Sequence, residues 1–300
     1  MTAGNALRLA LIGFGEAGGC LARDLAARPE VASVTAYDIL LHGADAPAMR
    51  ARADAMSVDC DDDLAGAIDG AHLVICAVTA SAALDAAQAA AAHLSEGQIY
   101  FDVNSVSPET KRRAADIVGA AGGRYVEAAV MGAVPPKGLA VPMLLGGPHA
   151  SDAKALLDPL GMQLQIAAAE IGHASAIKMT RSIMIKGIEA LAVECVLTAE
   201  HYGTSAEVIA SLDQTFPGLE WERLLGYLVS RVMLHGQRRA DEMREVAATI
   251  AATGLQPLMA TATADRQEWV ARRGLRDAVG KDGPHDFRHL AAAIRDRMDD

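Results

Sequence analysis

The sequence predicts an α/β fold: an N-terminal Rossmann-type doubly wound sheet, followed by an all-helical domain that a long helix joins to it. The N-terminal part alternates short β-rich runs with Ala-rich helical segments, which is typical of parallel βαβ units. The C-terminal part lacks any strand pattern. With 300 residues, the chain exceeds a typical single domain. We therefore expect two domains, over residues 1–170 and 171–300.

The N-terminal domain is expected to alternate strands and helices along its whole length. The β-rich runs predict strands at 7–13, 31–38, 72–78, 98–104, 124–130 and 141–147. Helical spacing predicts helices between them, at 18–28, 62–69, 81–94, 109–120 and 151–159. Strands and helices in this order favour a parallel sheet with helices on its faces.

The C-terminal domain is expected to consist of helices alone. A continuous helical pattern begins near residue 172 and ends near Gly203. Because globular helices average about 11–12 residues, so long a helix is suited to joining two domains. Further helices are expected at 205–213, 219–236, 237–253, 256–273 and 285–298.

Composition and charge exclude several classes of partner. The net charge of −11 argues against nucleic acid, which requires a cationic surface. The sequence has neither an apolar span of about 20 residues nor an export signal, so we expect no membrane partner. The cysteines form no CxxC pair, which indicates buried or free thiols in a reducing cytoplasm. These cysteines are Cys20, Cys60, Cys76 and Cys195.

The segment GFGEAG, residues 13–18, follows the first expected strand and opens the first helix. Gly13 permits a sharp turn, Gly15 allows a pyrophosphate to approach the backbone, and Gly18 allows the helix to pack on the strand. The spacing therefore predicts a dinucleotide-binding loop. Its residues are Gly13, Phe14, Gly15, Glu16, Ala17 and Gly18.

Asp38 ends the second expected strand, at the place where an acidic residue is required for NAD. Its carboxylate would accept hydrogen bonds from the ribose hydroxyls and repel the 2′-phosphate of NADP. Arg50 and Arg52 lie near enough in the sequence to keep NADP possible. We therefore expect NAD as the cofactor, with NADP left open.

Four segments in this order resemble motifs of the β-hydroxyacid dehydrogenases, a family that includes 3-hydroxyisobutyrate dehydrogenase and 6-phosphogluconate dehydrogenase. The first is GFGEAG with Asp38, and the second is DVNSVSPET (102–110), similar to D-x-S-T-x-x-P-x-T. The third, EAAVMGA (127–133), is similar to D-A-P-V-S-G-G, and the fourth, GHASAIKMTRS (172–182), to G-x-G-x-x-x-K-x-x-N-N. The C-terminal half resembles a subgroup whose helical domain was long labelled as of unknown function.

The resemblance implies a role for each matching position. Lys178 matches the catalytic lysine, and Asn104 and Ser105 match residues beside the nicotinamide end of the cofactor. Val78, which ends an expected strand, and Thr79, which follows it, complete the expected cofactor set. The positions implied on the substrate side are Ser105, Met131, Gly132, Arg181 and Ser182. The family also implies a homodimer with packed helical domains.

Lys178 fits this role on physical grounds as well. It follows the last β-rich run, on the first turns of the long helix, and Arg181 shares its helix face. A lysine there can accept the proton of a substrate hydroxyl, or donate it in the reverse direction. The alternative is an exposed lysine on a solvated helix.

The sequence departs from the family in its substrate motifs. Met131 stands where the family has Ser, and Arg181 and Ser182 replace the paired Asn. A guanidinium and an apolar wall favour an anionic hydroxy acid with a larger apolar substituent. Alternatively, Arg181 pairs with an acid such as Glu170. Ile185 replaces the general acid of the decarboxylating members, which disfavours that reaction.

We therefore predict an NAD-dependent oxidoreductase that acts on a 3-hydroxy acid or a related alcohol. The alternatives are an NADPH-dependent semialdehyde or imine reductase and a non-catalytic dinucleotide sensor. No metal is expected, because His285 and His289 lack a third ligand. His235, Arg238 and Arg239 could line the substrate cleft, but we expect them on a solvated helix face.

Overall fold

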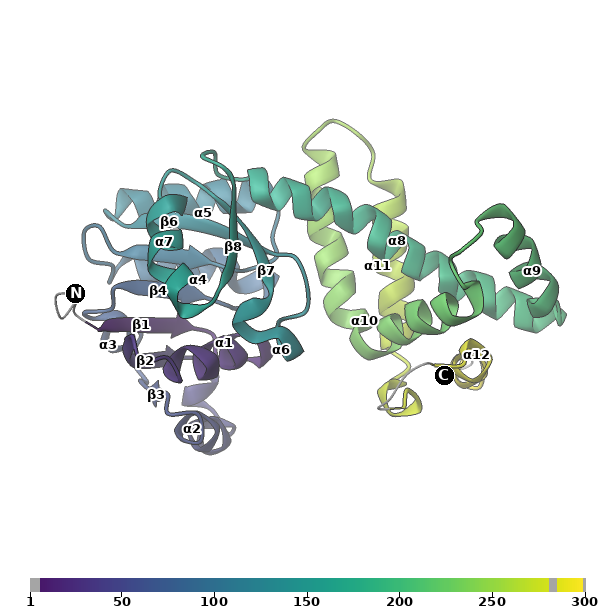
Figure 1. Ribbon diagram of the computed structural model, residues 1–300, viewed down its shortest axis with the longest axis horizontal. Coiled ribbons are helices and arrows are strands. Elements are labelled where there is room, and N and C mark those ends of the chain that lie inside the picture. Colours follow the sequence, from purple (N-terminus) through teal and green to yellow (C-terminus); the bar gives the residue numbers. More distant parts are fainter. Residues whose placement is uncertain (1–5, 281–284, 299–300) are drawn as a thin grey trace. The chain divides into compact units, whose positions relative to one another are not determined.

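The computed structural model describes residues 6–280 and 285–298. The chain divides into two compact units, Met1–Lys178 and Met179–Asp300. The prediction of a Rossmann-type sheet followed by a helical region is confirmed. A single helix, α8 (His173–Tyr202), begins in the first unit and continues in the second, as expected of the joining helix (Figure 1). The boundary that we expect after residue 170 stays a prediction.

The first unit is built on one sheet with the strand order β3-β2-β1-β4-β5-β6-β7-β8. The strands from β3 to β6 are parallel, β7 is antiparallel to β6, and β8 is parallel to β7. The first six have the order of a dinucleotide-binding sheet. The strands are β1 (Leu7–Ile12), β2 (Val31–Tyr37), β3 (Asp59–Cys60), β4 (Leu73–Cys76), β5 (Ile99–Asp102), β6 (Arg124–Val130), β7 (Pro142–Gly146) and β8 (Gln163–Ala168).

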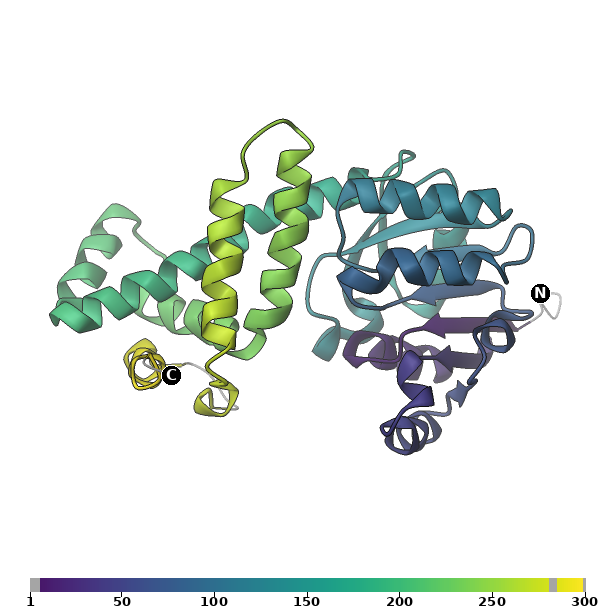
Figure 2. The same ribbon diagram turned by 180° about the vertical axis from the view of Figure 1, so that it is seen from behind.

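Helices cover both faces of this sheet (Figures 1 and 2). Residues of α1 and α7 pack in the core on one face, and residues of α3, α4 and α5 pack on the other. Because residues 9–12 of β1, all of β4 and residues 99–101 of β5 are buried on both sides, these stretches are continuous apolar runs. The helices are α1 (Glu16–Ala26), α2 (Ala46–Asp54), α3 (Leu64–Ile68), α4 (Ala83–Ala91), α5 (Pro108–Ala120), α6 (Val134–Lys137) and α7 (Ala150–Leu157).

Four strands and α-helices in the described part of the first unit were not predicted. The strand β3 has only two residues and lies at the sheet edge, and β8 alternates polar with apolar residues too briefly to stand out. The helix α2, APAMRARAD, has no apolar stripe, and α6 contains two prolines. None of these carries the periodic burial on which a sequence pattern depends.

The second unit consists of helices around an aliphatic core. The helix expected from residue 172 to near Gly203 is present as α8, and the rest are α9 (Ser205–Thr215), α10 (Trp221–Ala251), α11 (Leu258–Ala271) and α12 (Phe287–Arg295). The two helices expected at 219–236 and 237–253 are one helix, α10. Gly236 does not end it; a Cβ there would lie 2.6 Å from the carbonyl oxygen of Gln267, so this glycine allows α11 to pack closely.

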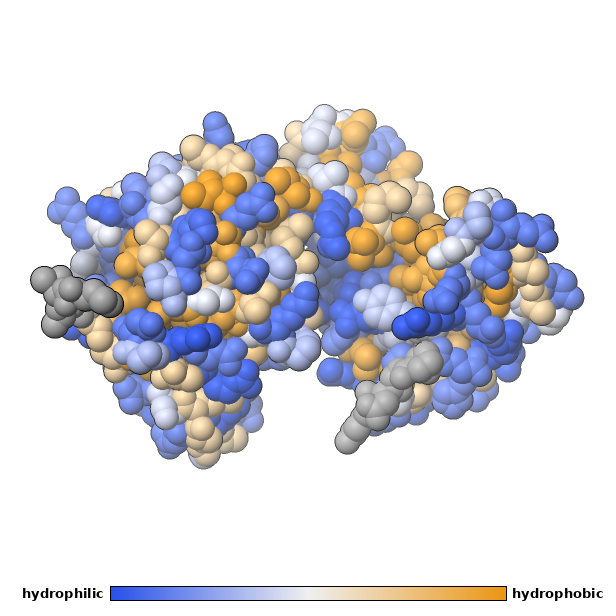
Figure 3. All heavy atoms as spheres, in the orientation of Figure 1, coloured by the Kyte–Doolittle hydropathy of each residue, from blue (hydrophilic) through white to orange (hydrophobic). Residues whose placement is uncertain are grey.

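Part of the α8 surface is apolar and exposed. Met184, Ile185, Ile188 and Leu191 all belong to the exposed large hydrophobic side chains. In Figure 3, hydrophobic residues gather over the middle of this helix. No helix in the described part of the chain combines the length and the apolar character that crossing a membrane requires.

Candidate functional site

The glycine-rich loop after β1 has the geometry that dinucleotide binding requires. Gly13 has a φ of 93°, and a Cβ there would lie 2.5 Å from the carbonyl oxygen of Ala77. A Cβ at Gly18 would overlap the carbonyl oxygen of Gly13, whereas a Cβ at Gly15 would meet nothing within 4 Å. The loop is thus closed by packing at its first and third glycines and open at the second.

The N-terminus of α1 is suited to an anion. Gly15 is its N-cap residue, and no side chain caps the helix there. The first backbone N–H groups of a helix lack partners within the helix and carry partial positive charge. Open space beside Gly15 together with these donors fits the pyrophosphate of a dinucleotide. Glu16 and Ala17 supply two of these N–H groups.

Asp38 lies at the carboxyl end of β2, beside the same loop. One oxygen of its carboxylate accepts a hydrogen bond from the backbone N–H of Phe14 at 2.7 Å, and the other accepts one from Leu40 at 3.0 Å. These bonds hold the carboxylate against the loop. Each carboxylate oxygen has a second lone pair, so Asp38 can also accept from hydroxyl groups.

The two arginines that kept NADP possible have different surroundings. Arg50 pairs with Asp62 at the surface. Arg52 donates a hydrogen bond to the carbonyl oxygen of Phe14, and its guanidinium stacks on the Phe14 ring at 4.6 Å. Of these two arginines, Arg52 is therefore the one that contacts the glycine-rich loop. Arg52 also lines a hollow beside this loop. That hollow, of about 340 Å³, is lined by Gly15, Glu16, Gly19, Cys20, Arg23, Arg52, Met56, Pro135 and Pro136.

The side chain of Asn104, which follows β5, contacts the end of β4. Its side-chain oxygen accepts a hydrogen bond from the backbone N–H of Val78 at 2.7 Å, and its amide nitrogen lies 3.2 Å from the sulfur of Cys76. Burial raises the pKa of the Cys76 thiol to about 12. The side chain of Asn104 is buried, whereas Thr79 is exposed at the start of the following turn. Asn104 thus shapes the carboxyl edge of the sheet at the ends of β4 and β5; β4 also borders β1, where the strand order of the sheet reverses.

Lys178 and Ser105 meet although they are far apart in the sequence. The ammonium group of Lys178, on the second turn of α8, donates a hydrogen bond to the hydroxyl of Ser105, which follows β5. Lys178 is half-buried, not freely exposed. The second and fourth motifs are therefore joined at the carboxyl edge of the sheet.

Two buried carboxylates, Asp102 on β5 and Glu127 on β6, were not identified from the sequence. Asp102 accepts hydrogen bonds from the Tyr125 hydroxyl at 2.6 Å and from the Asn104 backbone N–H at 2.9 Å, and it pairs with Lys111 at 3.0 Å. Burial, followed by the charge of Asp102, raises the pKa of Tyr125, so this phenol stays a donor. Glu127 lies on the neighbouring strand. Side-chain periodicity treats charged residues as exposed, so nothing in the pattern marked them as buried.

The positions implied on the substrate side have different degrees of exposure. Met131 is half-buried and Gly132 exposed, and both follow β6. Arg181 is exposed on α8. Ser182 is buried, and its hydroxyl accepts a hydrogen bond from Lys186 at 2.9 Å.

The expectation of a solvated face for His235, Arg238 and Arg239 holds only for Arg238, which is exposed and pairs with Glu242 at 2.6 Å. Arg239 is buried and pairs with Glu189 at 2.6 Å, because it faces the interior of the helical unit. His235 is half-buried. Burial, followed by Arg231 and other nearby arginines, lowers the pKa of His235 to about 4.

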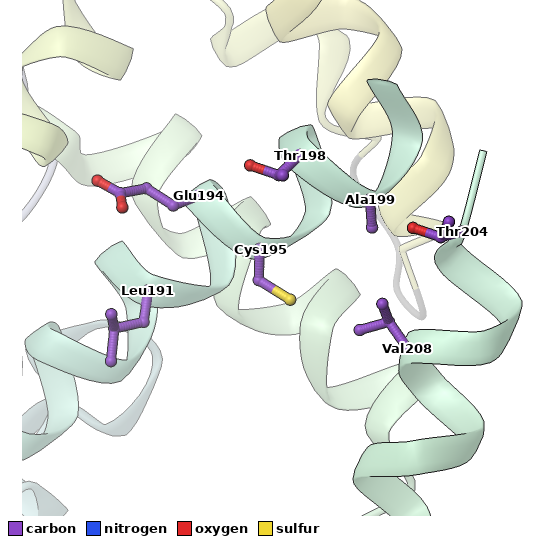
Figure 4. Close-up of a pocket in the computed structure, with 7 residues that line it drawn as sticks. All are labelled: Leu191, Glu194, Cys195, Thr198, Ala199, Thr204 and Val208. Atoms are coloured by element: carbon purple, nitrogen blue, oxygen red, sulfur yellow. The ribbon is translucent and has the colours of Figure 1, made fainter. Parts of the chain in front are cut away.

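A second hollow, of about 470 Å³, lies in the helical unit between α8 and the start of α9. Figure 4 shows Leu191, Cys195 and Ala199 of α8 beside it, with Val208 of α9 opposite. Burial raises the pKa of the Cys195 thiol. The hollow includes none of our candidate site residues. Among the residues that the structure describes, no group of three His, Cys, Asp or Glu side chains could hold a metal ion.

The sheet order and the glycine-rich loop define a dinucleotide-binding protein of the Rossmann type. Residues 8–168 match the NAD binding domain of 6-phosphogluconate dehydrogenase, and residues 199–270 match a domain of unknown function, DUF1932. The chain therefore belongs to the 6-phosphogluconate dehydrogenase-like family, in the subgroup with this C-terminal domain. The family resemblance and the NAD-binding domain that we predicted are confirmed.

Solved structures agree with this assignment. A conserved hypothetical protein from Sinorhizobium meliloti 1021 is 36% identical, with 98% of each chain covered and a TM-score of 0.76. A conserved protein described as similar in structure to 3-hydroxyacid dehydrogenases is 31% identical, with 91% of this chain and 100% of that chain covered and a TM-score of 0.70. The 3-hydroxyisobutyrate dehydrogenase of Mycobacterium tuberculosis is 16% identical, with 97% and 100% covered and a TM-score of 0.71, and shows the same fold.

Proposed function

We propose that this protein is an NAD-dependent oxidoreductase that oxidises the hydroxyl of a 3-hydroxy acid or a related alcohol, or reduces the corresponding carbonyl. Lys178 is the general acid and base. The observation that carries the proposal is the hydrogen bond between Lys178 and Ser105. It joins two family motifs at the edge of the sheet where Rossmann-type domains bind their ligands.

The cofactor would be held by residues of the first unit. The pyrophosphate would bind at the glycine-rich loop, the ribose at Asp38, and the nicotinamide end near Val78, Thr79, Asn104 and Ser105. Bound NAD would supply the hydride acceptor for alcohol oxidation. The hydrogen bonds that Asp38 accepts from Phe14 and Leu40 support a fixed carboxylate at the ribose position. This carboxylate is the reason that we propose NAD over NADP.

Lys178 and Ser105 would move the proton. A substrate hydroxyl that takes the place of one partner in their hydrogen bond would lie within reach of the amine. The neutral amine can then accept the hydroxyl proton during oxidation, and the ammonium can return it to the alkoxide during reduction. Ser105 would orient the hydroxyl through a second hydrogen bond.

On the substrate side we propose Met131, Gly132, Arg181 and Ser182. Arg181 lies on the same helix as Lys178, one turn further along, and its guanidinium can hold a carboxylate through two parallel hydrogen bonds. Since the hydroxyl of Ser182 already accepts from Lys186, we assign the anion to Arg181 first. We further propose a homodimer, because Met184, Ile185, Ile188 and Leu191 form an exposed apolar face on α8.

The test is NAD reduction across a panel of 3-hydroxy acids by the wild type and Lys178→Met. The substitution should lower kcat about 10²–10⁴-fold, the usual contribution of a positioned acid or base. The affinity for NAD, measured by calorimetry, should change little. The control is Lys154→Met, which should retain activity. It removes a lysine of α7 that pairs with Asp158.

Two results would contradict this assignment. If Lys178→Met retains more than about a tenth of the activity, Lys178 is not the acid or base. If the wild type binds NAD but turns over no member of the panel, and reduces no carbonyl or imine with NADH or NADPH, the protein is a dinucleotide sensor.

A further inference from the structure

Glu127 is a fully buried carboxylate in the middle of β6, on the strand next to the one that leads to Ser105. One of its oxygens accepts hydrogen bonds from the backbone N–H groups of Gly172 at 2.9 Å and Ala174 at 3.0 Å. The other accepts from the hydroxyl of Ser175 at 2.7 Å. All three donors lie at the start of α8: Gly172 directly precedes the helix, and Ala174 and Ser175 belong to its first turn. Both oxygens of a buried anion are therefore committed to one helix end.

This arrangement fixes the start of α8 with respect to the sheet. The first N–H groups of a helix lack partners within it, and a carboxylate there is stabilised by the helix dipole. The carboxylate also has little freedom to move, because a Cβ at Gly146 on β7 would overlap it. Burying such a charge is favourable only while its hydrogen bonds are made. Any shift of the helix start would break them.

Lys178 lies three residues beyond Ser175, about one helical turn. Its ammonium reaches Ser105, which is held by the loop after β5. The contact between these side chains thus depends on two separately anchored backbones. The anchor on the Lys178 side is Glu127.

We propose that Glu127 is a positioning residue that holds Lys178 at Ser105. Glu127 needs no contact with substrate or cofactor for this, since it acts through the first turns of α8. The expected effect of Glu127 on catalysis rests on the proposed function, in which Lys178 is the acid and base. The physical claim, that Glu127 sets the environment of the Lys178 amine, can be measured without any substrate.

The experiment compares Glu127→Gln, Glu127→Met and Ser175→Ala with the wild type. Gln keeps an oxygen for the two backbone N–H groups, and its amide can donate to the Ser175 hydroxyl, so the hydrogen bonds survive without the charge. Met has a similar length and no strong acceptor. Ser175→Ala removes one donor of the three. Glu109→Gln and Glu109→Met, at an exposed glutamate paired with Arg112 on α5, are the matched controls.

The first readout is the rate at which an acylating reagent modifies Lys178, followed by peptide mass spectrometry over a range of pH without substrate. Glu127→Met should change this rate severalfold, Ser175→Ala less, and Glu127→Gln least, while the Glu109 variants match the wild type. The second readout is kcat, which should fall about 100-fold in Glu127→Met, the scale of a small misplacement, with NAD affinity nearly kept. Gln should recover most of that loss.

The outcomes separate this proposal from the proposed function. Wild-type Lys178 acylation in both Glu127→Met and Ser175→Ala would overturn the positioning role, whatever the activity. Equal changes of the acylation rate and of kcat in Glu127→Gln and Glu127→Met would overturn it too, because the hydrogen bonds that Gln keeps would then not matter. If Glu127→Met does not fold, the acylation rate of Lys178 in Ser175→Ala is compared with the rate in Glu127→Gln. The positioning role then requires a larger change in Ser175→Ala than in Glu127→Gln. A wild type without oxidoreductase activity defeats the proposed function, while the acylation result still stands.

Discussion

Asp102 and Glu127 lie opposite each other in register on the neighbouring strands β5 and β6, and both carboxylates are buried. Asp102 holds the backbone N–H of Asn104, next to Ser105, and Glu127 holds the start of the helix that carries Lys178. Paired residues on parallel strands point to the same face of the sheet. Two adjacent anions thus stabilise the two backbones whose side chains meet at the candidate catalytic contact.

The buried ion pair between Lys111 and Asp102 should be important for stability. Lys111 and Asp102 are each almost fully buried, so Lys111→Met would leave a buried carboxylate without its cation. We expect a loss of about 3–5 kcal/mol in the free energy of unfolding, the scale for breaking a buried pair. The measurement is urea unfolding followed by circular dichroism. The double variant with Asp102→Asn should lose less than the sum of the single variants. Additive losses would mean that the two side chains are not coupled.

Asp38 should set the cofactor preference. Replacing it with Ser removes the acceptor for the ribose hydroxyls and the charge that repels a 2′-phosphate. We expect the preference for NAD over NADP to shift by about 1–3 kcal/mol, the scale of hydrogen bonds to charged groups. Calorimetric titration of both cofactors measures it. Asp45→Ser, at an aspartate before α2, is a control and should leave the preference unchanged. A wild type that already prefers NADP would show that Asp38 does not lie at the ribose.

His235 should make the helical unit sensitive to acid. Its pKa in the folded protein is about 4, below its ordinary value of 6.5, because of burial first and then Arg231 and other arginines. Between these two values the unfolded chain binds the proton more readily, so the stability present above about pH 6.5 is lost as the pH falls toward 4. Both tryptophans, Trp221 and Trp269, lie in the helical unit, so their fluorescence reports its unfolding.

The comparison is urea unfolding at pH 7 and pH 5 for the wild type and His235→Gln. From pH 7 to 5 the wild type should lose about 1 kcal/mol more than the variant, a value reduced because the imidazole is only half-buried. Carboxylates titrate in both proteins, so the difference isolates the histidine. Identical losses in the two proteins would show that His235 has an ordinary pKa.

The parts of this fold that could be predicted are those where burial follows a simple period. Strands buried on both faces form apolar runs, and each glycine of the loop solves a local steric problem, so β1, the loop and Asp38 could all be predicted. Buried charges could not be predicted in this way. Glu127 and Gly172 are 45 residues apart, and only the fold brings a carboxylate to that helix end. Arg239 was expected in solvent for the same reason, since its partner Glu189 lies on another helix.

Arg181 is the residue that would decide the class of substrate. It is exposed one turn beyond Lys178 on α8, where the family has a neutral Asn, and a guanidinium binds a carboxylate more strongly than an amide does. Met131 adds a flexible apolar side chain after β6. They are the reason that we propose an anionic hydroxy acid larger and more apolar than 3-hydroxyisobutyrate as the substrate.

The measurement compares kcat/KM for a hydroxy acid and its methyl ester in the wild type and in Arg181→Gln. If Arg181 binds the carboxylate, its loss should cost about 2–4 kcal/mol of transition-state binding for the acid and little for the ester. Arg113→Gln, at an exposed arginine on α5, is the control for a changed net charge and should affect neither substrate. Equal losses for acid and ester in Arg181→Gln would instead mean that this arginine stabilises the fold. The carboxylate would then have to be bound by another group, because a neutral ester and an anion cannot depend equally on a cation that binds only the anion.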